Sequence, residues 1–308
     1  MSDHVPNVGL HDRRARDRRV RVDRDVPVMG PSHAACGAAA WVALTADYTL
    51  QFSDFSVPIG FGVLPVGDAG VVTGALICAG AALLPDIDHP SGTVARSLPP
   101  FSGWLARIVS RLSGGHRRGT HSLIGLLVFT LLAWLSQNAA LPVGDGLRWL
   151  AESSGDDSAP AVVAALPGQV WPLAAVLSVL MIAFAVKVLA FLPGRISHAN
   201  WLVAIGLGIV VATNPPDHPW WFVIAVALGC AVHMIGDMVT TQGIHLLWPL
   251  RPRLPVPSTF YRGRSFVRFP ILGKAGSGME LAVLTPISVY AMVGLACALA
   301  AWGGVTLG

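Results

Sequence analysis

The chain has 308 residues, of which 53% are hydrophobic and only 12% are charged, and its formal net charge is +4. An average soluble domain has roughly 25% charged residues, so this composition argues against an ordinary soluble globular protein.

Seven apolar blocks follow one another along the chain, and each is long enough, or nearly so, for the roughly 20 residues of a spanning helix. Burial in a soluble core is the alternative, but helices that are apolar all round have no polar face to present to water. The blocks lie at 33–50, 70–85, 121–138, 171–192, 197–213, 220–240 and 281–302. The sequence therefore predicts an all-α fold, a polytopic membrane bundle of about seven transmembrane helices, with residues 31–308 as a single domain.

Residues 1–30 precede this domain and carry a mixed-charge, arginine-rich run at 11–25. We interpret them as a disordered arm beside anionic lipid, with nucleic-acid binding as the weaker alternative. No signal peptide is visible, because the first 32 residues lack an apolar h-region. The four cysteines lie inside apolar blocks without CxxC spacing, which predicts core residues rather than disulfides or a zinc knuckle.

The segments between the blocks also carry information. Gly and Pro are frequent in 58–70 and 142–170, which predicts loops. Residues 104–112 place five apolar side chains on one helical face opposite Arg107 and Arg111, as in a short helix lying in the membrane interface. Residues 251–274 interleave arginines with aromatic residues and predict a loop on lipid headgroups, although a phosphate-bearing substrate would suit the same residues.

The basic residues predict the orientation. Seven helices alternate sides, and 19 of the 21 lysines and arginines then fall in one set of segments, the N-terminal arm, 86–120, 193–196 and 241–280. The other set contains Arg148 alone, and Lys187 lies in the fourth block near the basic side. Because Lys and Arg remain in the cytoplasm, the N-terminus is predicted to be cytoplasmic and the C-terminus extracytoplasmic.

Four short clusters of histidine and aspartate lie at helix ends. They are Ser32-His33 at the start of the first block, Leu84-Pro85-Asp86-Ile87-Asp88-His89 at the end of the second, His116-Arg117-Arg118-Gly119-Thr120-His121-Ser122 at the start of the third, and His233 with Asp237 near the end of the sixth. By the alternation of the helices, all four reach the cytoplasmic face. Histidine and aspartate played no part in assigning the orientation, so this convergence is independent evidence for one shared site.

His233 and Asp237 are spaced i, i+4, which puts both side chains on one helix face and suits two ligands of one metal ion. An aspartate inside the bilayer costs about 2.5 kcal/mol or more, and such residues face a cavity or a partner. Each cluster alone has an ordinary explanation: His33 as a helix-end residue, Asp86 and Asp88 as turn formers, His116 as further positive charge. Their convergence favours metal binding.

These clusters resemble the YdjM family of LexA-regulated inner-membrane proteins. The resemblance rests on Ser32-His33, LPDIDH at 84–89, HRRGTHS at 116–122, and a run of His233, Asp237, Thr240 and Gly243 followed by Leu247 and Pro249, in the family's order over roughly residues 30–250. It implies a metal-dependent hydrolase embedded in the bacterial inner membrane. The arginine-rich arm and the long 139–170 loop depart from the shorter family pattern. The ligand types also resemble the all-helical zinc phospholipase C and nuclease group, in style alone.

The leading hypothesis is a hydrolase in which metal-activated water attacks an amphiphilic ester or phosphoester at the cytoplasmic face. The predicted ligands of one or two divalent ions, zinc first and manganese or magnesium as alternatives, are His33, Asp86, His89, His121, His233 and Asp237. The predicted catalytic side chains are Asp88, His116, Arg117 and Arg118. Asp88 is expected to orient a ligand or act as general base, and the two arginines are expected to bind an anionic group.

Two other functions are compatible with the same residues. Metal could hold the helix ends together without chemistry, although the chain offers more ligands than one closed tetrahedral site needs. A metal or proton transporter would need polar residues that continue to the outer face, and those helix halves offer little beyond Asp47 and a few hydroxyls. The expected partners are membrane lipids and a lipid-like or phosphate-bearing substrate.

Overall fold

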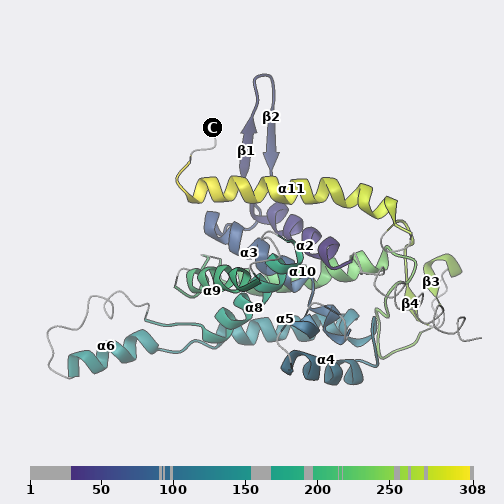
Figure 1. Cartoon of the computed structure of the whole chain (residues 1–308), viewed down its shortest axis with the longest axis horizontal. Helices are drawn as coiled ribbons and strands as arrows, with labels where there is room; N and C mark the ends of the chain where they lie inside the picture. The colour runs from purple at the N-terminus through teal and green to yellow at the C-terminus, as the bar shows by residue number, and fades with distance from the viewer. Residues whose placement is uncertain are drawn as a thin grey trace, which may run out of the picture.

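The computed structural model describes residues 29–305 except 90–91, 93, 98–99, 154–167, 191–196, 214, 217, 253–256, 263–264 and 274–276. The predicted arm therefore lies outside the described residues, apart from residues 29 and 30, which begin the first described helix. The described chain is mostly helical, and its apolar helices lie stacked in layers (Figure 1).

Each of the seven apolar blocks forms an α-helix. These helices are α2 (Met29–Thr45), α3 (Gly67–Ala81), α5 (Leu123–Asn138), α8 (Pro172–Val188), α9 (Ser197–Thr213), α10 (Trp221–Met238) and α11 (Gly278–Trp302). Two further helices are α4 (Phe101–Leu112) and α6 (Val143–Ser153), and short 3-10 helices are η1 (Pro85–Asp88), η2 (Val94–Arg96), η3 (Gly119–His121) and η4 (Ser258–Phe260).

The sequence predicted about seven membrane-spanning helices, and fewer of the observed helices are long enough to span a membrane. Among the described residues, three helical segments are long and apolar enough to cross a membrane, namely Gly67–Asp88, Trp221–Met238 and Gly278–Trp302. The other four apolar helices have 16 or 17 residues, just short of the roughly 20 that a bilayer core requires.

Two small antiparallel hairpins and one helix were not predicted. Strand β1 (Tyr48–Gln51) pairs with β2 (Ser56–Ile59), and β3 (Tyr261–Arg262) pairs with β4 (Phe266–Val267). The first block was expected to remain helical to residue 50, but its helix ends at Thr45 and β1 follows. Burial alternates along β1, which is the period of a strand. Helix α6 likewise interrupts the segment 142–170, which was predicted to be a loop.

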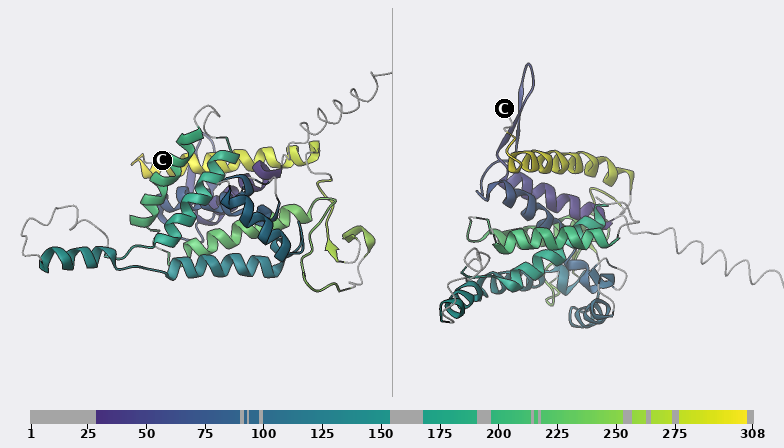
Figure 2. Two further views of the ribbon diagram at one scale, coloured as in Figure 1. Left: turned by 60° about the horizontal axis from the view of Figure 1, so that its bottom comes forward. Right: turned by 60° about the vertical axis from the view of Figure 1, so that its left-hand side comes forward.

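Helix α3 is the centre of the stack. It contacts α2, α10, α8 and α11, and its residues from Gly70 to Ala81 are all buried, whereas most of α11 is not. Helix α11 lies along one edge of the stack and α4 along the opposite edge, as the views in Figures 1 and 2 agree. Strands β3 and β4 lie at one end of the helices and α6 lies at the other (Figure 1), so segments from the two predicted sets of loops are separated in space.

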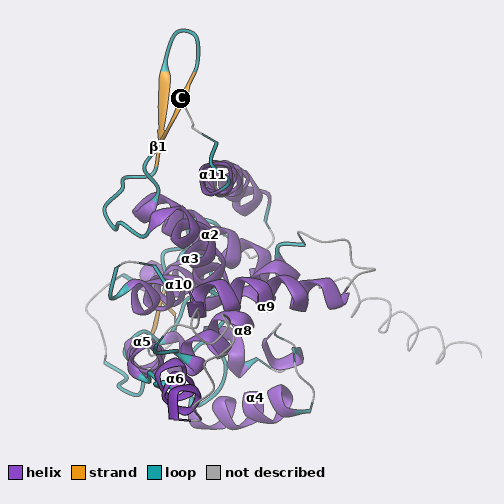
Figure 3. Ribbon diagram, turned by 90° about the vertical axis from the view of Figure 1, so that its left-hand side faces the viewer, coloured by secondary structure: helices purple, strands orange, loops and turns teal. Residues whose placement is uncertain are grey.

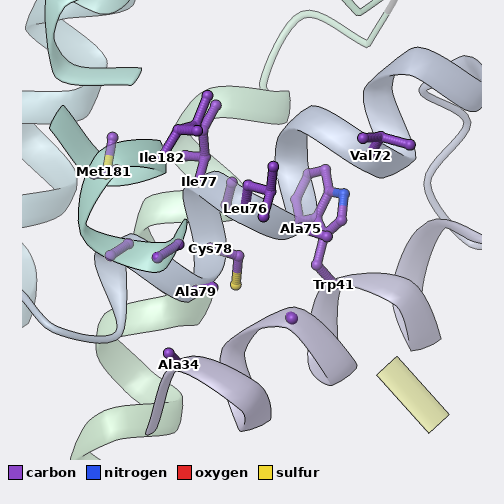
Figure 4. Packing of buried hydrophobic residues seen from close by; sticks show 14 of the residues in the cluster. Ala34, Trp41, Val72, Ala75, Leu76, Ile77, Cys78, Ala79, Met181 and Ile182 are labelled. Carbon is purple, nitrogen blue, oxygen red and sulfur yellow. The ribbon is translucent and has the colours of Figure 1, made fainter. Parts of the chain in front are cut away.

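Small residues allow the central helices to approach closely. Trp41 of α2 lies fully buried against α3 near Val72 and Ala75 (Figure 4). A Cβ atom on Gly80 would lie only 2.0 Å from the carbonyl oxygen of Met181 in α8. Close approach of backbones through small residues is the usual way in which membrane helices pack.

Helix α4 has the amphipathic character predicted for residues 104–112. Trp104 and Leu105 are exposed apolar residues, and Arg107 and Arg111 are exposed as well. In Figure 3 α11 is seen almost end-on while α4 lies lengthwise across the view, so α4 runs at an angle to α11. Its location in the membrane interface stays a prediction.

We expect the Gly80→Ala variant to be destabilised, because its added methyl group would overlap the α8 backbone, and overpacking of this kind costs about 1–3 kcal/mol. The matched control is Gly206→Ala in α9, where a Cβ meets nothing within 4 Å and alanine favours the helix. Thermal unfolding in detergent should show a lower melting temperature for the first variant alone. Equal melting temperatures would contradict the close packing of α3 on α8.

Candidate metal centre

Four separate stretches of chain deliver the histidines and aspartates to one place. His33 comes from the first turns of α2, and Asp86 and Asp88 come from η1, directly after α3. His121 ends η3, and His233 and Asp237 lie on the last turns of α10. The predicted convergence of the four clusters is therefore confirmed by the contacts among these side chains.

Four ligand atoms form the centre of the cluster. The Nε2 atoms of His121 and His233 are 3.0 Å apart. Asp86 Oδ1 lies 3.5 Å from the first and 3.7 Å from the second, and Asp237 Oδ2 lies 3.4 Å and 3.7 Å from the same two atoms. Two nitrogen ligands of a tetrahedral zinc ion, each at ~2.0–2.1 Å, would be roughly 3.3 Å apart. The spacing of the two imidazole nitrogens is therefore close to that of two ligands of one metal ion.

The tautomer of His233 is assigned by its backbone partner. Its Nδ1 atom lies 2.6 Å from the carbonyl oxygen of Ala82. A carbonyl oxygen can only accept, so Nδ1 carries the proton and donates it. The neutral ring then directs an unprotonated Nε2 at the cluster, which is the form that binds metal.

A chain of hydrogen bonds assigns His121 in the same way. The hydroxyl of Thr120 donates to Asp88 Oδ2 at 2.6 Å, which uses its one proton. Its oxygen lies 3.0 Å from His121 Nδ1 and must accept from that nitrogen. Nε2 of His121 is therefore also free of a proton when the ring is neutral, and the two facing nitrogens present lone pairs to each other.

Asp237 links this centre to His33. Its Oδ1 lies 3.5 Å from His33 Nε2 and 2.9 Å from Arg117 Nη2, although the arginine contact is an ion pair without hydrogen-bond geometry. The ring of His33 stacks on that of His233 with centroids 4.0 Å apart. Gly236 allows this position, because a Cβ there would lie 2.9 Å from the His33 ring.

Arg117 is buried beside Asp237 in an uncommon backbone conformation. Its φ of 61° lies in the left-handed region, which costs a non-glycine residue about 1–3 kcal/mol. Its carbonyl oxygen accepts a hydrogen bond from the backbone N–H of His245 at 3.0 Å, and its Nη1 donates to Thr240 Oγ1 at 3.3 Å. These contacts hold the guanidinium against the carboxylate.

One edge of the cluster is accessible. The side chains of His121, His233 and Asp237 are at most 1% exposed, whereas those of Asp86 and His116 are 26% and 36% exposed. His116 Nδ1 lies 2.9 Å from Asp88 Oδ1. Burial lowers the pKa of His116, but the hydrogen bond and charge of Asp88, with the charge of Asp86, outweigh it and hold that pKa above its usual value.

The residues present fit a divalent cation. Asp237 Oδ1 is ion-paired with Arg117, but Asp237 Oδ2 is buried without a hydrogen bond and lies 3.4 and 3.7 Å from the Nε2 atoms of His121 and His233. A buried polar atom without a hydrogen bond is costly, and a cation beside Oδ2 would satisfy it together with the two facing imidazole nitrogens. Two groups of residues have the geometry to hold a metal ion, namely His33, His233 and Asp237, and Asp86, His116 and His121.

Two predicted site residues lie at the margin. The ring of His89 contacts that of His116, with centroids 4.8 Å apart. Arg118 supplies a carbonyl oxygen that accepts from the backbone N–H of His121, but no contact described for the chain joins its side chain to the cluster.

Three other contributors were not predicted. Thr120 connects Asp88 to His121, the Ala82 carbonyl orients His233, and the backbone N–H of His245 holds Arg117. Burial, with the nearby charges of Arg251 and Arg118, lowers the pKa of His245. The position of Thr120 next to a ligand histidine was the one signal available in the sequence.

A family model described as YdjM inner membrane protein matches residues 28–306. No curated protein and no solved structure matches the chain significantly. The matched range includes every residue of the cluster.

We expect His121→Ala and His233→Ala to lose most of the bound metal, because each removes one of the four central ligand atoms. Metal analysis of detergent-purified protein by mass spectrometry would measure this. His218→Ala is the matched control, since that histidine lies at the other end of α10 and contacts the backbone of Trp220. An unchanged metal load in the two ligand variants would exclude this centre.

Thr120→Val should weaken metal binding without removing a ligand, because the hydroxyl that orients His121 is lost. Partners of this kind contribute roughly 10- to 100-fold to metal affinity. Competition with a chromogenic chelator would report the affinity, with Thr130→Val in α5 as control, since that hydroxyl bonds its own helix backbone. If both variants retain wild-type affinity, Thr120 does not orient the ligand.

Proposed function

The chain belongs to the YdjM inner membrane protein family and lies in the bacterial inner membrane, and from this premise we propose that it is a metal-dependent hydrolase. The proposed substrate is an amphiphilic ester or phosphoester, and zinc is the proposed ion. Two imidazoles and two carboxylates are ligands that zinc accepts readily. Manganese or magnesium would favour a more oxygen-rich set.

We infer that the centre lies at the cytoplasmic end of the helices. The segments rich in arginine belong to the end that carries the cluster, and positive charge remains inside. In this arrangement the shorter apolar helices cross the bilayer together with the three long ones, and the N-terminus is cytoplasmic and the C-terminus extracytoplasmic. Small mismatches of length are accommodated by local thinning or by flanking residues.

The observation that carries the proposal is the uneven burial of the ligands. One side of the cluster is closed by buried His121, His233 and Asp237, whereas Asp86 and His116 are accessible. A structural metal site is normally closed, and a catalytic one keeps a position for water or substrate. The accessible edge provides such a position.

Each side chain then has a role set by its contacts. A bound divalent ion would lower the pKa of a water molecule and polarise the ester oxygen. His116, beside Asp88 and at the accessible edge, holds a proton that it can pass to the leaving group. Asp88 orients His116 and, through Thr120, His121. Arg117 holds Asp237 in place by their ion pair rather than binding the substrate.

The remaining predicted residues have lesser roles in this proposal. His33 approaches the centre through Asp237 and would complete the shell of one ion or help to hold a second. Arg118 and the arginines of 251–268 are suited to an anionic headgroup. An amphiphilic substrate follows from a site placed at the end of membrane helices.

Transport is disfavoured by the core beyond the centre. The buried polar residues described there are Thr45, Thr73 and Ser178, and the hydroxyl of each bonds a carbonyl of its own helix. A path for ions needs polar groups that continue across the membrane. Among the described residues the titratable cluster occupies one end of the helices alone.

Two variants separate metal binding from chemistry in a hydrolysis assay with zinc-loaded protein in nanodiscs and a panel of phospholipids and polyprenyl phosphates. Asp86→Ala should lose both metal and hydrolysis, because it removes a ligand. His116→Gln should keep most of the metal, because the four central atoms of His121, His233, Asp86 and Asp237 remain, but it should hydrolyse at least roughly 100-fold more slowly, the usual contribution of a positioned acid or base. Stripping the metal with chelator should abolish hydrolysis, and re-addition should restore it.

The proposal fails if wild-type protein that carries metal hydrolyses none of these lipids. It also fails if chelator leaves hydrolysis unchanged. Full activity in His116→Gln would contradict the assignment of His116 as proton donor but would not contradict the metal centre.

A further inference from the structure

A cavity of about 540 Å³ lies beside the metal centre. It is bounded by η1, η2, α4, α5, α8 and one residue of α10. Its volume lies within the roughly 300–1,000 Å³ of small-molecule sites. We name it the α4 groove, after the amphipathic helix along one of its sides.

The α4 groove shares one turn of chain with the metal centre. Leu84 and Ile87 line the groove, while Asp86 and Asp88 of the same stretch direct their carboxylates to the cluster. The two kinds of side chain alternate over five residues, so the polar centre and the apolar groove lie on two sides of η1. Asp86 is therefore separated from the lining residue Ile87 by one peptide bond.

The lining of the α4 groove offers little to a polar ligand. Its polar side-chain groups are three hydroxyls and the indole N–H of Trp104, and each hydroxyl already donates its proton to a backbone carbonyl. Ser97 bonds Val94, Ser102 bonds Ala95 and Ser136 bonds Leu132, at 2.7, 2.9 and 2.6 Å. The favourable occupant is therefore a hydrocarbon chain, whose burial is worth about 0.8 kcal/mol per CH₂ group.

Helix α4 makes the groove accessible from lipid. Phe101, Trp104 and Leu105 line it and are also 76%, 60% and 44% exposed, so apolar surface continues from the inside of the groove to the outside. Exposed apolar side chains on an amphipathic helix are typical of contact with acyl chains. A chain can thus enter sideways, without leaving the apolar phase.

The other large cavity is also lined by exposed apolar residues, among them Leu281, Val289 and Met292 of α11, but none of the residues that line it belongs to η1. It lies between α2 and α11 and contains the Ser32–Glu280 hydrogen bond of 2.9 Å. A carboxylate in its wall makes it less suited to a hydrocarbon chain. It serves as the natural control.

We propose that the α4 groove binds one hydrocarbon chain of a membrane lipid, whose headgroup ester then lies at the accessible edge of the metal centre. This deepens the hydrolase proposal and rests on it for the identity of the chain as part of a substrate. The groove would select lipids by their apolar part, and the side chains of η1 would set the distance between chain and reacting ester.

The test uses full-length protein in nanodiscs that contain phosphatidylglycerol with a photoreactive diazirine midway along one acyl chain. After irradiation, mass spectrometry maps the labelled peptides. We expect labelling concentrated on α4, α5 and α8 residues of the groove. Ala133→Phe fills the groove from α5, where Ala133 is 2% exposed, and should lower this labelling about tenfold, or ~1.4 kcal/mol.

Ala291→Phe is the matched control, because Ala291 is equally small, 5% exposed and lines the cavity between α2 and α11. It should leave labelling of the α4 groove unchanged. Labelling spread evenly over all lipid-facing helices in the wild type would overturn the proposal and indicate surface lipid alone. This wild-type measurement decides the question even if Ala133→Phe does not fold.

Hydrolysis and metal content are measured in the same samples. Chain labelling in the groove together with an inactive, metal-loaded protein would support the groove and contradict the hydrolase. Hydrolysis that persists in Ala133→Phe with wild-type chain-length preference would contradict the groove and leave the hydrolase intact.

Discussion

The facing Nε2 atoms of His121 and His233, 3.0 Å apart between the carboxylates of Asp86 and Asp237, impose the constraint on which the rest of this molecule depends. Four atoms with lone pairs or negative charge repel one another in a buried site unless a cation lies among them. These four side chains come from η1, η3 and α10. A cation there would therefore join the end of α3, the start of α5 and the end of α10.

The geometry of this cluster depends on the close packing of α10 against α3. Gly229 of α10 brings that helix so close to α3 that a Cβ would lie 2.4 Å from the carbonyl oxygen of Cys78. The same close approach puts His233, one turn further on, within reach of the Ala82 carbonyl. Gly236 then leaves room for the ring of His33. Widening of the α3–α10 contact would therefore misplace ligands as well as loosen the core.

The sequence predicted those features that depend on a local pattern of residues or on the alternation of successive helices between the two sides of the membrane. The seven helices came from continuous apolar runs, and the convergence of the clusters came from counting sides. The β1–β2 hairpin was not predicted, since four-residue strands are specified by their pairing.

The individual roles of the site residues were not predicted either. The carbonyl that orients His233 is 151 residues away, and the ion pair of Arg117 with Asp237 joins distant segments. Such contacts have no local pattern.

The short helix η1 is the reason why we propose an amphiphilic rather than a soluble ester as the substrate. Its residues alternate between carboxylates that face the cluster and apolar side chains that line the α4 groove. A soluble substrate would bind only at the metal centre, and the α4 groove would then have no role in binding the substrate. In the proposed function, a membrane lipid would use both sides of the turn, because its ester and its chain are joined at a fixed distance. Burial of the chain would supply binding energy away from the reacting bond, which positions that bond at the accessible edge.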